Sequence, residues 1–239
     1  MKLAQILFSQ GFGTRRDCEG LAACGLVAVD GVRCDDPFTE FDPVGRMLTV
    51  EGRDWPYRES ALLVLHKPAG YECSKKPKHH PSVYSLLPAP LLRRDVQAIG
   101  RLDEDTTGLL LFTDDGQLLH RWTSPKHHVP KVYDVSCKHE VTPAQLQRLV
   151  QGVVLADDPA TVRALAAAPW DGAAEGLHGL RLTLAEGRYH QVKRMLAAVG
   201  NRVEALHRSR FGAYALPQDL ALGAWRWLAG VHDVVPARA

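Results

Sequence analysis

The sequence has no long hydrophobic run. Its longest apolar stretches, such as 61–65 and 109–112, are far shorter than the ~20 residues needed to cross a bilayer. The first residues also lack the apolar segment and small-residue cleavage site of a secretory signal peptide. We therefore expect a cytoplasmic protein that makes no contact with a membrane.

Cysteine is scarce and odd in number. The chain has 5 cysteines, and no two have the Cys-x-x-Cys spacing of a zinc or redox site. This pattern argues against a disulfide framework and favours buried thiols. The adjacent histidine pairs at 79–80 and 127–128 raise the alternative of a metal site, but no histidine pair at i, i+4 spacing with a supporting acid accompanies them. We expect no metal.

The remaining composition is that of an ordinary globular protein. Of 239 residues, 46% are hydrophobic and 23% are charged. This length favours a large domain with a small satellite. A polar stretch with glycine and proline at 51–60 precedes an apolar run. We therefore predict a small domain at 1–55, a linker at 56–60 and a large domain at 61–239.

The small domain reads as two short helices packed on a small sheet. Apolar residues at helical spacing open the chain, and Thr14 followed by Asp17 is the pattern of a capped second helix. Two β-prone runs at 26–29 and 32–34 flank an Asp-Gly turn, and 47–50 is a further strand candidate.

The large domain alternates strand and helix patterns, which predicts a mixed α/β or α+β domain. We expect strands at 61–65, 109–113, 132–135 and 180–184, and helices at 117–122, from Thr142 with Pro143 in its first turn, and at 188–199.

The net charge of +2 conceals an asymmetry. Residues 1–55 carry 6 basic and 9 acidic side chains, whereas 181–210 carry 7 basic and 2 acidic. The basic segment suits a polyanion, because each neutralised phosphate releases counterions. A solvated basic face explains the charge alone equally well.

A loop rich in carboxylates lies within 100–116, where Asp103, Glu104 and Asp105 precede an apolar strand. Loops on a rigid strand often present reactive groups, so the loop is a candidate acid or nucleophile. Carboxylates this close repel one another, and a cation from Arg101 or a basic helix is needed to keep one of them ionised in a cleft. A solvated turn with capping aspartates is the alternative.

Two further segments carry candidate groups. On the helix expected at 188–199, Lys193 flanks the apolar stripe and can reach an adjoining site, while His190 and Arg194 lie opposite the stripe; a solvated face is the alternative. On the strand expected at 132–135, Tyr133 faces away from its two neighbours and is either a core aromatic or a wall on which an unpaired base stacks. The tract at 75–80 reads as a basic surface loop able to touch phosphates.

Together these segments resemble the RsuA branch of the pseudouridine synthases. The resemblance is carried by Lys67-Pro68-Ala69-Gly70, by Gly100-Arg101-Leu102-Asp103 continuing to Gly116, by Lys131-Val132-Tyr133 and by 186–195, in this order. Residues 1–55, with Gly13-Thr14-Arg15-Arg16 and the Asp-Gly turn, resemble an S4 RNA-binding domain.

The resemblance implies an α+β fold, in which a catalytic domain on a mixed, largely antiparallel sheet follows a small S4-like α/β domain. It implies isomerisation of uridine to pseudouridine without a cofactor. Asp103 is then the catalytic aspartate, acting as nucleophile or as base, with Tyr133 as the active-site tyrosine and Lys193 as the basic partner. Expected RNA contacts come from Arg101, Arg15, Arg16, Arg188, His190 and Arg194. Because 1–55 is net acidic, we expect only a local phosphate contact from its arginines.

The resemblance also indicates a substrate. Tyr189-His190 stands where large-subunit relatives usually carry Asn-Arg, which favours uridine 516 of 16S rRNA, free or in a small-subunit assembly intermediate, as the target of a monomeric enzyme. Three alternatives remain: a 23S rRNA synthase of the same family, a non-catalytic S4-type RNA-binding or assembly protein, and a glycoside hydrolase pairing Asp103 with Asp105.

Overall fold

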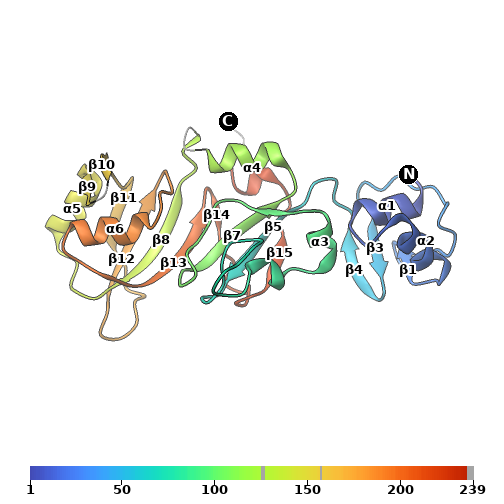
Figure 1. Ribbon diagram of the computed structural model, residues 1–239, viewed down its shortest axis with the longest axis horizontal. Helices are drawn as coiled ribbons and strands as arrows, with labels where there is room; N and C mark the ends of the chain where they lie inside the picture. Colours follow the sequence, from blue (N-terminus) through green and yellow to red (C-terminus); the bar gives the residue numbers. More distant parts are fainter. Residues whose placement is uncertain (125–126, 157, 236–239) are drawn as a thin grey trace. The chain divides into compact units, whose positions relative to one another are not determined.

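The structure, a computed structural model, describes residues 1–124, 127–156 and 158–235 (Figure 1). The chain forms two compact units. The first contains Met1–Ala61, Leu87–Gln97 and Thr113–Asp115, and the second contains Leu62–Leu86, Ala98–Phe112 and Gly116–Ala239. We retain 1–55, 56–60 and 61–239 as the proposed domain and linker limits. No helix within the described ranges is long and apolar enough to span a membrane.

The first unit begins with two helices, as the sequence predicts: α1 (Leu3–Ser9) and α2 (Arg15–Ala23). The Thr14 hydroxyl accepts the Asp17 N–H at 3.2 Å, and the Asp17 carboxylate accepts the Thr14 N–H at 2.8 Å. This reciprocal pair satisfies two amides that the helix leaves unbonded, and so fixes where α2 begins. A third helix, α3 (Ala89–Arg93), belongs to the same unit.

The first unit's sheet has the order β2-β1-β3-β4. Strands β1 (Val27–Val29), β2 (Val32–Arg33) and β3 (Met47–Val50) confirm the predictions. Strand β4 (Arg53–Pro56), within the polar stretch at 51–60, was not predicted. Glu51 and Gly52 both adopt positive φ, 50° and 76°, which turns the chain back onto β3. Since Trp55 is the one buried side chain of β4, the strand carries little hydrophobic pattern.

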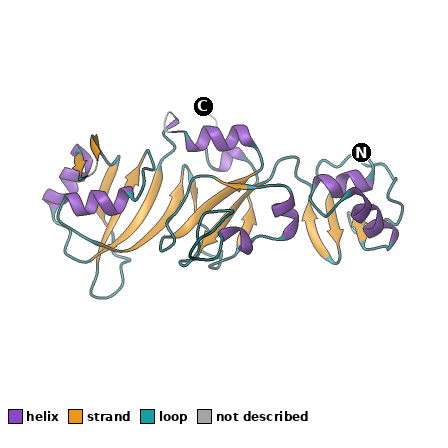
Figure 2. Ribbon diagram, viewed as in Figure 1, coloured by secondary structure: helices purple, strands orange, loops and turns teal. Residues whose placement is uncertain are grey.

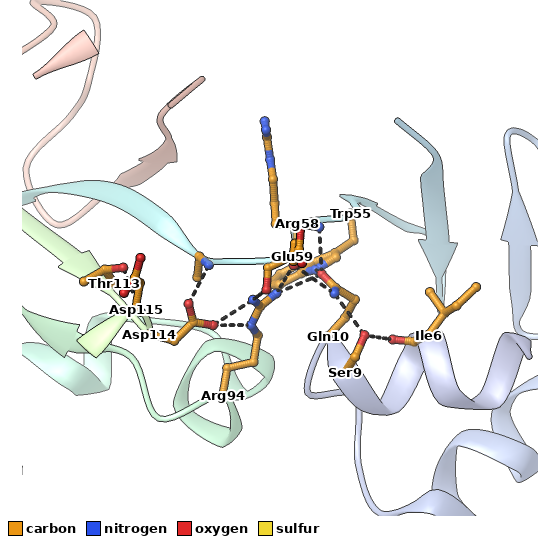
Figure 3. Close-up of polar contacts among 11 residues, drawn as sticks. Ile6, Ser9, Gln10, Trp55, Arg58, Glu59, Arg94, Thr113, Asp114 and Asp115 are labelled. Carbon is orange, nitrogen blue, oxygen red and sulfur yellow. Dashed lines mark hydrogen bonds and ion pairs between the residues drawn. The ribbon is translucent and has the colours of Figure 1, made fainter. Parts of the chain in front are cut away.

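A polar network inside the first unit joins three stretches of sequence (Figure 3). The Arg94 guanidinium donates twice to Asp114, at 2.8 and 2.7 Å. It also donates to the Arg58 carbonyl at 2.8 Å and to the side-chain carbonyl of buried Gln10 at 2.9 Å. Asp114 in turn accepts the Ala61 N–H at 2.7 Å. Residues before 62 are thereby bonded to two segments that follow much later in the chain.

The second unit is built on a large sheet with the order β11-β12-β8-β13-β7-β5-β15; β6 pairs with β7, and β14 with β13. Among the pairings whose register is described, only β13 with β7 is parallel, which confirms a mixed, largely antiparallel sheet. The strands are β5 (Leu62–Lys67), β6 (Gln97–Ala98), β7 (Thr107–Thr113), β8 (Lys131–Cys137), β11 (Ala166–Pro169), β12 (His178–Leu184), β13 (Val203–Phe211), β14 (Tyr214–Ala215) and β15 (Trp225–Trp227). Strands β9 (Val153–Leu155) and β10 (Asp158–Val162) form a separate pair.

Helices pack on this sheet at two places (Figure 2). Leu118 and Trp122 of α4 (Gly116–Thr123) share a core cluster with Leu109 and Leu111 of β7 and with residues of β5. Helix α5 (Pro143–Gln151) contacts β11, and α6 (Gln191–Ala198) contacts β9 and β13. Short 3₁₀ turns lie at Val83–Leu86 and Val231–Asp233.

Helix α6 begins three residues later than the sequence predicts. The side chain of Gln191 accepts the Arg188 N–H at 2.9 Å, which closes a turn over 188–191. His190 is held in the left-handed region, with φ 47°, and cannot continue a helix backwards. The buried stripe Val192, Met195, Leu196 and Val199 is as expected.

Candidate active site

A buried lysine holds the backbone of the carboxylate loop, the segment that contains Asp103, Glu104 and Asp105. Lys67, at the end of β5, is fully buried, and its ammonium donates to the carbonyls of Pro68 at 3.0 Å, Glu104 at 3.1 Å and Thr106 at 2.8 Å. The Thr106 N–H closes the loop by donating to the Asp103 carbonyl at 3.1 Å. Burial lowers the pKa of Lys67, and neighbouring acidic groups oppose that shift.

Lys67 stands in the sequence as the first residue of the motif Lys67-Pro68-Ala69-Gly70, and that motif alone did not predict a role for it. The available signal was a single lysine closing the apolar run 61–65. A lysine in that position must find carbonyl or carboxylate partners when the strand is buried.

Strand β7, which follows the loop, pairs directly with β13 in the sheet. Thr107 lies opposite His207, and Gly108 lies opposite Arg208. Gly108 has φ 108°, and a Cβ there would sit 2.7 Å from the Arg208 backbone nitrogen. The buried Arg208 side chain donates to the Leu109 carbonyl at 2.7 Å. The end of the loop is therefore held by close backbone contact that a larger residue would disturb.

An open pocket lies beside Asp103, and all of its lining residues belong to the second unit. One carboxylate oxygen of Asp103 is 3.6 Å from the Lys193 ammonium, and the other is 3.4 Å from Nε2 of His190. Lys193 also bonds both carboxylate oxygens of Asp105 at 2.7 Å. The loop and α6 thus meet through one lysine that bridges two carboxylates.

The two bridged carboxylates differ in their surroundings. The Asp103 side chain is 25% exposed and lines the pocket, whereas that of Asp105 is 56% exposed and is not part of the lining. From the sequence we expected a cation beside this loop, either Arg101 or a residue of a basic helix. The structure shows that the helix supplies it, through Lys193. Of the two carboxylates, only that of Asp103 lines the pocket.

These carboxylates stabilise the charged form of Lys193. Burial acts to lower the pKa of Lys193, but the hydrogen bond to Asp105 and the charges of Asp105, Asp103 and Glu104 outweigh it, so the pKa is raised above 10.5. A raised lysine pKa gives stabilisation that is complete below 10.5 and is lost as the pH climbs through the higher folded value. The ion pairs are therefore intact throughout the neutral range.

Tyr133 forms another wall of the pocket. It is buried, at 7% exposed, and projects from β8. Its neighbours Val132 and Asp134 line a different pocket, together with His66 and His207. This confirms the predicted alternation along β8, and it places an aromatic ring on the same pocket as Asp103.

The expected RNA-contacting residues are divided between the two units. Arg101, Arg188 and His190 line the pocket. Arg194 does not line it and donates instead to the Tyr189 carbonyl at 3.0 Å.

Arg15 and Arg16 are exposed on α2 of the first unit.

The position of His190 differs from the prediction. It was expected opposite the buried stripe of its helix. Instead it precedes the helix, and its left-handed backbone turns the ring toward Asp103.

Acidic, histidine and cysteine side chains do not assemble into a metal site in the part of the chain that the structure describes: no three or more of them gather in a group able to hold an ion. We assign no metal ligands.

The chain is similar to known proteins over most of its length. Residues 61–198 match the family model described as RNA pseudouridylate synthase. The chain is similar to an uncharacterised RNA pseudouridine synthase of Bacillus subtilis, YtzG, with 36% identity over 95% of each protein. It is also similar to the ribosomal small subunit pseudouridine synthase A of Vibrio parahaemolyticus, with 37% identity over 95% of this chain and 96% of that protein.

The chain is also similar to the crystal structure of a pseudouridylate synthase, with a TM-score of 0.64 and 32% identity over 96% of each chain. The family match, the near full-length relatives and the shared fold all lead to the same assignment. The chain belongs to the RNA pseudouridylate synthase family and is an enzyme of that class, an isomerase that converts uridine in RNA to pseudouridine.

Proposed function

We propose that this enzyme isomerises uridine 516 of 16S rRNA, with Asp103 as the catalytic residue. The observation that carries the assignment of Asp103 is its position on the pocket, between Lys193 at 3.6 Å and His190 at 3.4 Å. Asp105 is closer to Lys193 but lies outside the pocket lining, so it serves to position that lysine.

The reaction rearranges one nucleotide without adding or removing atoms overall. The bond between N1 of uracil and C1′ of the sugar breaks, the base turns, and C5 bonds to C1′. The proton leaves C5, and N1 carries one in the product. Because a stacked base would be out of reach, the nucleotide flips into the pocket first, at a cost of a few kcal/mol for unstacking.

Asp103 must be ionised for either of the two routes open to it. As a nucleophile it attacks the sugar or the base, and as a base it removes a sugar proton; a protonated carboxyl does neither. Lys193, which stays charged at neutral pH, supports the ionised form. The buried lysine beneath the loop and the contact of Gly108 with β13 hold the carboxylate in place.

The remaining pocket residues bind and position the nucleotide. Tyr133 stacks on the flipped base and assists removal of the C5 proton. Arg101, Arg188 and His190 supply positive or hydrogen-bonding groups around the pocket opening for the flanking phosphates. No group of the pocket calls for a cofactor.

The 16S target is supported by the relative named ribosomal small subunit pseudouridine synthase A, which is similar over nearly the whole chain. Tyr189-His190 favours the same subunit. Tyr189 is 73% exposed and stacks on His190 with ring centroids 3.8 Å apart, so the pair presents an aromatic surface beside the pocket. A 23S rRNA target is the second candidate.

Mapping of pseudouridine tests the target. The full-length protein is incubated, without added metal or cofactor, with 16S and 23S transcripts and with partly assembled small subunits. Carbodiimide treatment and primer extension then locate the product. A single stop at the 516 region of 16S rRNA supports the proposal; a stop in 23S rRNA alone keeps the chemistry and overturns the target.

The first unit is proposed to act as an S4-like RNA-binding domain whose contact is local. Replacement of both Arg15 and Arg16 by glutamine in the full-length chain removes two exposed cations from the start of α2. We expect a higher KM for rRNA with unchanged kcat, and a salt dependence of binding that is shallower by up to about two. An unchanged KM and salt dependence would exclude this contact.

A further inference from the structure

The basic loop at 74–82 contributes no residue to the lining of the pocket beside Asp103. It contains three lysines, two histidines and no acidic residue. Residues 75–81 are all exposed. Like charges packed this densely repel one another, so a defined loop conformation needs a specific means of holding the backbone.

Glu72 provides that hold. Its carboxylate accepts the backbone N–H groups of Lys78 at 3.1 Å, His79 at 2.8 Å and His80 at 2.9 Å. These hydrogen bonds, led by those from His79 and His80, lower the pKa of Glu72 to about 2. Consecutive amides of this kind form a cradle for an anion. Because the protein's own carboxylate fills the cradle, the loop offers a ligand its side chains and not its amides.

The two ends of the loop are also tied together. The Ser82 hydroxyl donates to the Ser74 carbonyl at 2.5 Å. The Glu72 N–H donates to the Pro81 carbonyl, and the Val83 N–H to the Glu72 carbonyl, each at 2.9 Å. The three amide bonds to Glu72 and the bonds that join the two ends of the loop hold its backbone in one conformation. The lysine side chains therefore project from a preformed surface.

The base of the loop is bonded to the active site. The Sγ of Cys73 accepts the Leu102 N–H at 3.4 Å, and the Gly70 N–H donates to the Glu104 carbonyl at 2.8 Å. Leu102 lines the pocket between Arg101 and Asp103. The segment that is bonded to the carboxylate loop therefore continues directly into the basic loop.

We propose that the loop at 74–82 is a preformed binding surface for the phosphates that flank the target uridine, with the lysines supplying the attraction and Glu72 fixing their positions. The proposal rests on the proposed function, because it takes RNA as the substrate. An ordered loop loses little conformational entropy on binding. The high positive charge without any exposed acid in the loop favours RNA over an acidic protein segment, which would need hydrogen-bonding and apolar partners as well.

The lysine contribution is tested by replacing Lys76 and Lys78 with glutamine. Lys75 is left in place because its ammonium already lies 5.5 Å from the ring centre of Tyr84. A matched control replaces two exposed cations elsewhere in the second unit, Lys138 and Arg163. Binding to a 16S transcript is measured over a range of KCl concentrations.

We expect the Lys76 and Lys78 variant to bind roughly 10- to 50-fold more weakly at 0.1 M salt, with a salt slope shallower by about 1.4 to 1.8. The control should keep the wild-type slope. Equal effects in both variants, or none in either, would overturn the proposal. Unchanged affinity for the transcript with reduced modification of assembled subunits would overturn it in favour of a protein contact.

The role of Glu72 is tested by Glu72→Gln, which makes the loop more positive by one charge while leaving at least one amide donor without an acceptor. Simple attraction predicts tighter RNA binding for this variant. If Glu72 orders the loop, we expect weaker RNA binding, by about fivefold, together with faster amide exchange in the peptide covering 73–83. Tighter binding would contradict this role of Glu72. RNA binding is measured separately from pseudouridine formation, so the two proposals can fail independently. If the wild-type enzyme binds the transcript but modifies another RNA, the 16S target is refuted, and the comparison of the loop variants remains valid.

Discussion

At the scale of single residues, the site depends on how one lysine serves two carboxylates. Lys193 is bonded more closely to Asp105, at 2.7 Å, than to Asp103, at 3.6 Å, yet only Asp103 lines the pocket. Placement on the pocket, and not proximity to a cation, is therefore the reason that we propose Asp103 as the reactive group. Asp105 anchors the lysine so that its charge lies next to Asp103.

We predict that Lys193→Met lowers kcat on the order of 10²-fold, since a preorganised charge beside the reacting group is lost. Lys193→Arg keeps the charge and should lose much less. Urea unfolding and RNA binding, measured in parallel, distinguish this role from a structural one, because loss of the charge should lower kcat without a matching loss of stability or affinity. Equal values of kcat for the methionine and arginine variants would contradict the role.

Only some of these contacts could be predicted from the sequence. The need for a cation beside Asp103, and the position of Lys193 on the flank of an amphipathic helix, follow from charge and periodicity. The contact of His190 with Asp103 does not, because it arises from a left-handed backbone at one residue. Helical periodicity assumes regular geometry and so placed this side chain on the wrong face.

Among the secondary-structure elements, the pairing of β7 with β13 holds the carboxylate loop in place. The two strands are parallel where Gly108 meets Arg208, and the glycine lets the backbones approach more closely than a Cβ would allow. Strand β7 itself was predictable from its apolar run. Its parallel partner was not, since a strand pattern does not reveal which distant strand lies beside it.

Gly108→Ala should therefore destabilise the fold by about 2–4 kcal/mol, from the combined cost of a positive φ and of overpacking against β13. Gly116→Ala is the control, because a Cβ at the start of α4 meets nothing within 4 Å. Urea unfolding of both variants measures the difference. Equal stability of the two would show that the pairing of β7 with β13 tolerates a side chain.

At the scale of the whole molecule, the two compact units do not follow the order of the sequence. The first unit takes in Leu87–Gln97 and Thr113–Asp115 as well as the N-terminal residues. Composition could locate a polar stretch near 51–60, but it could not show that Arg94 and Asp114 are bonded to that stretch. Such contacts join residues far apart in the chain and leave no local pattern.

Arg94→Ala tests how far this network stabilises the first unit. The Arg94 and Asp114 side chains are only 5% and 16% exposed, and removing one partner of a buried pair leaves the other charge uncompensated. We expect a loss of about 3 kcal/mol in urea unfolding. The exposed pair of Arg46 with Asp30 is the control, and Arg46→Ala should leave stability nearly unchanged. Similar losses in the two variants would refute a special role for Arg94.

Asp103 is proposed to carry out the isomerisation. Single-turnover pseudouridine formation by Asp103→Asn and Asp105→Asn, on the rRNA that the wild-type enzyme modifies, tests this role, with RNA binding measured in parallel. We expect no detectable product from Asp103→Asn at nearly wild-type affinity, and a reduced but measurable rate from Asp105→Asn. Product formation by Asp103→Asn at the wild-type rate would show that Asp103 is not the catalytic residue.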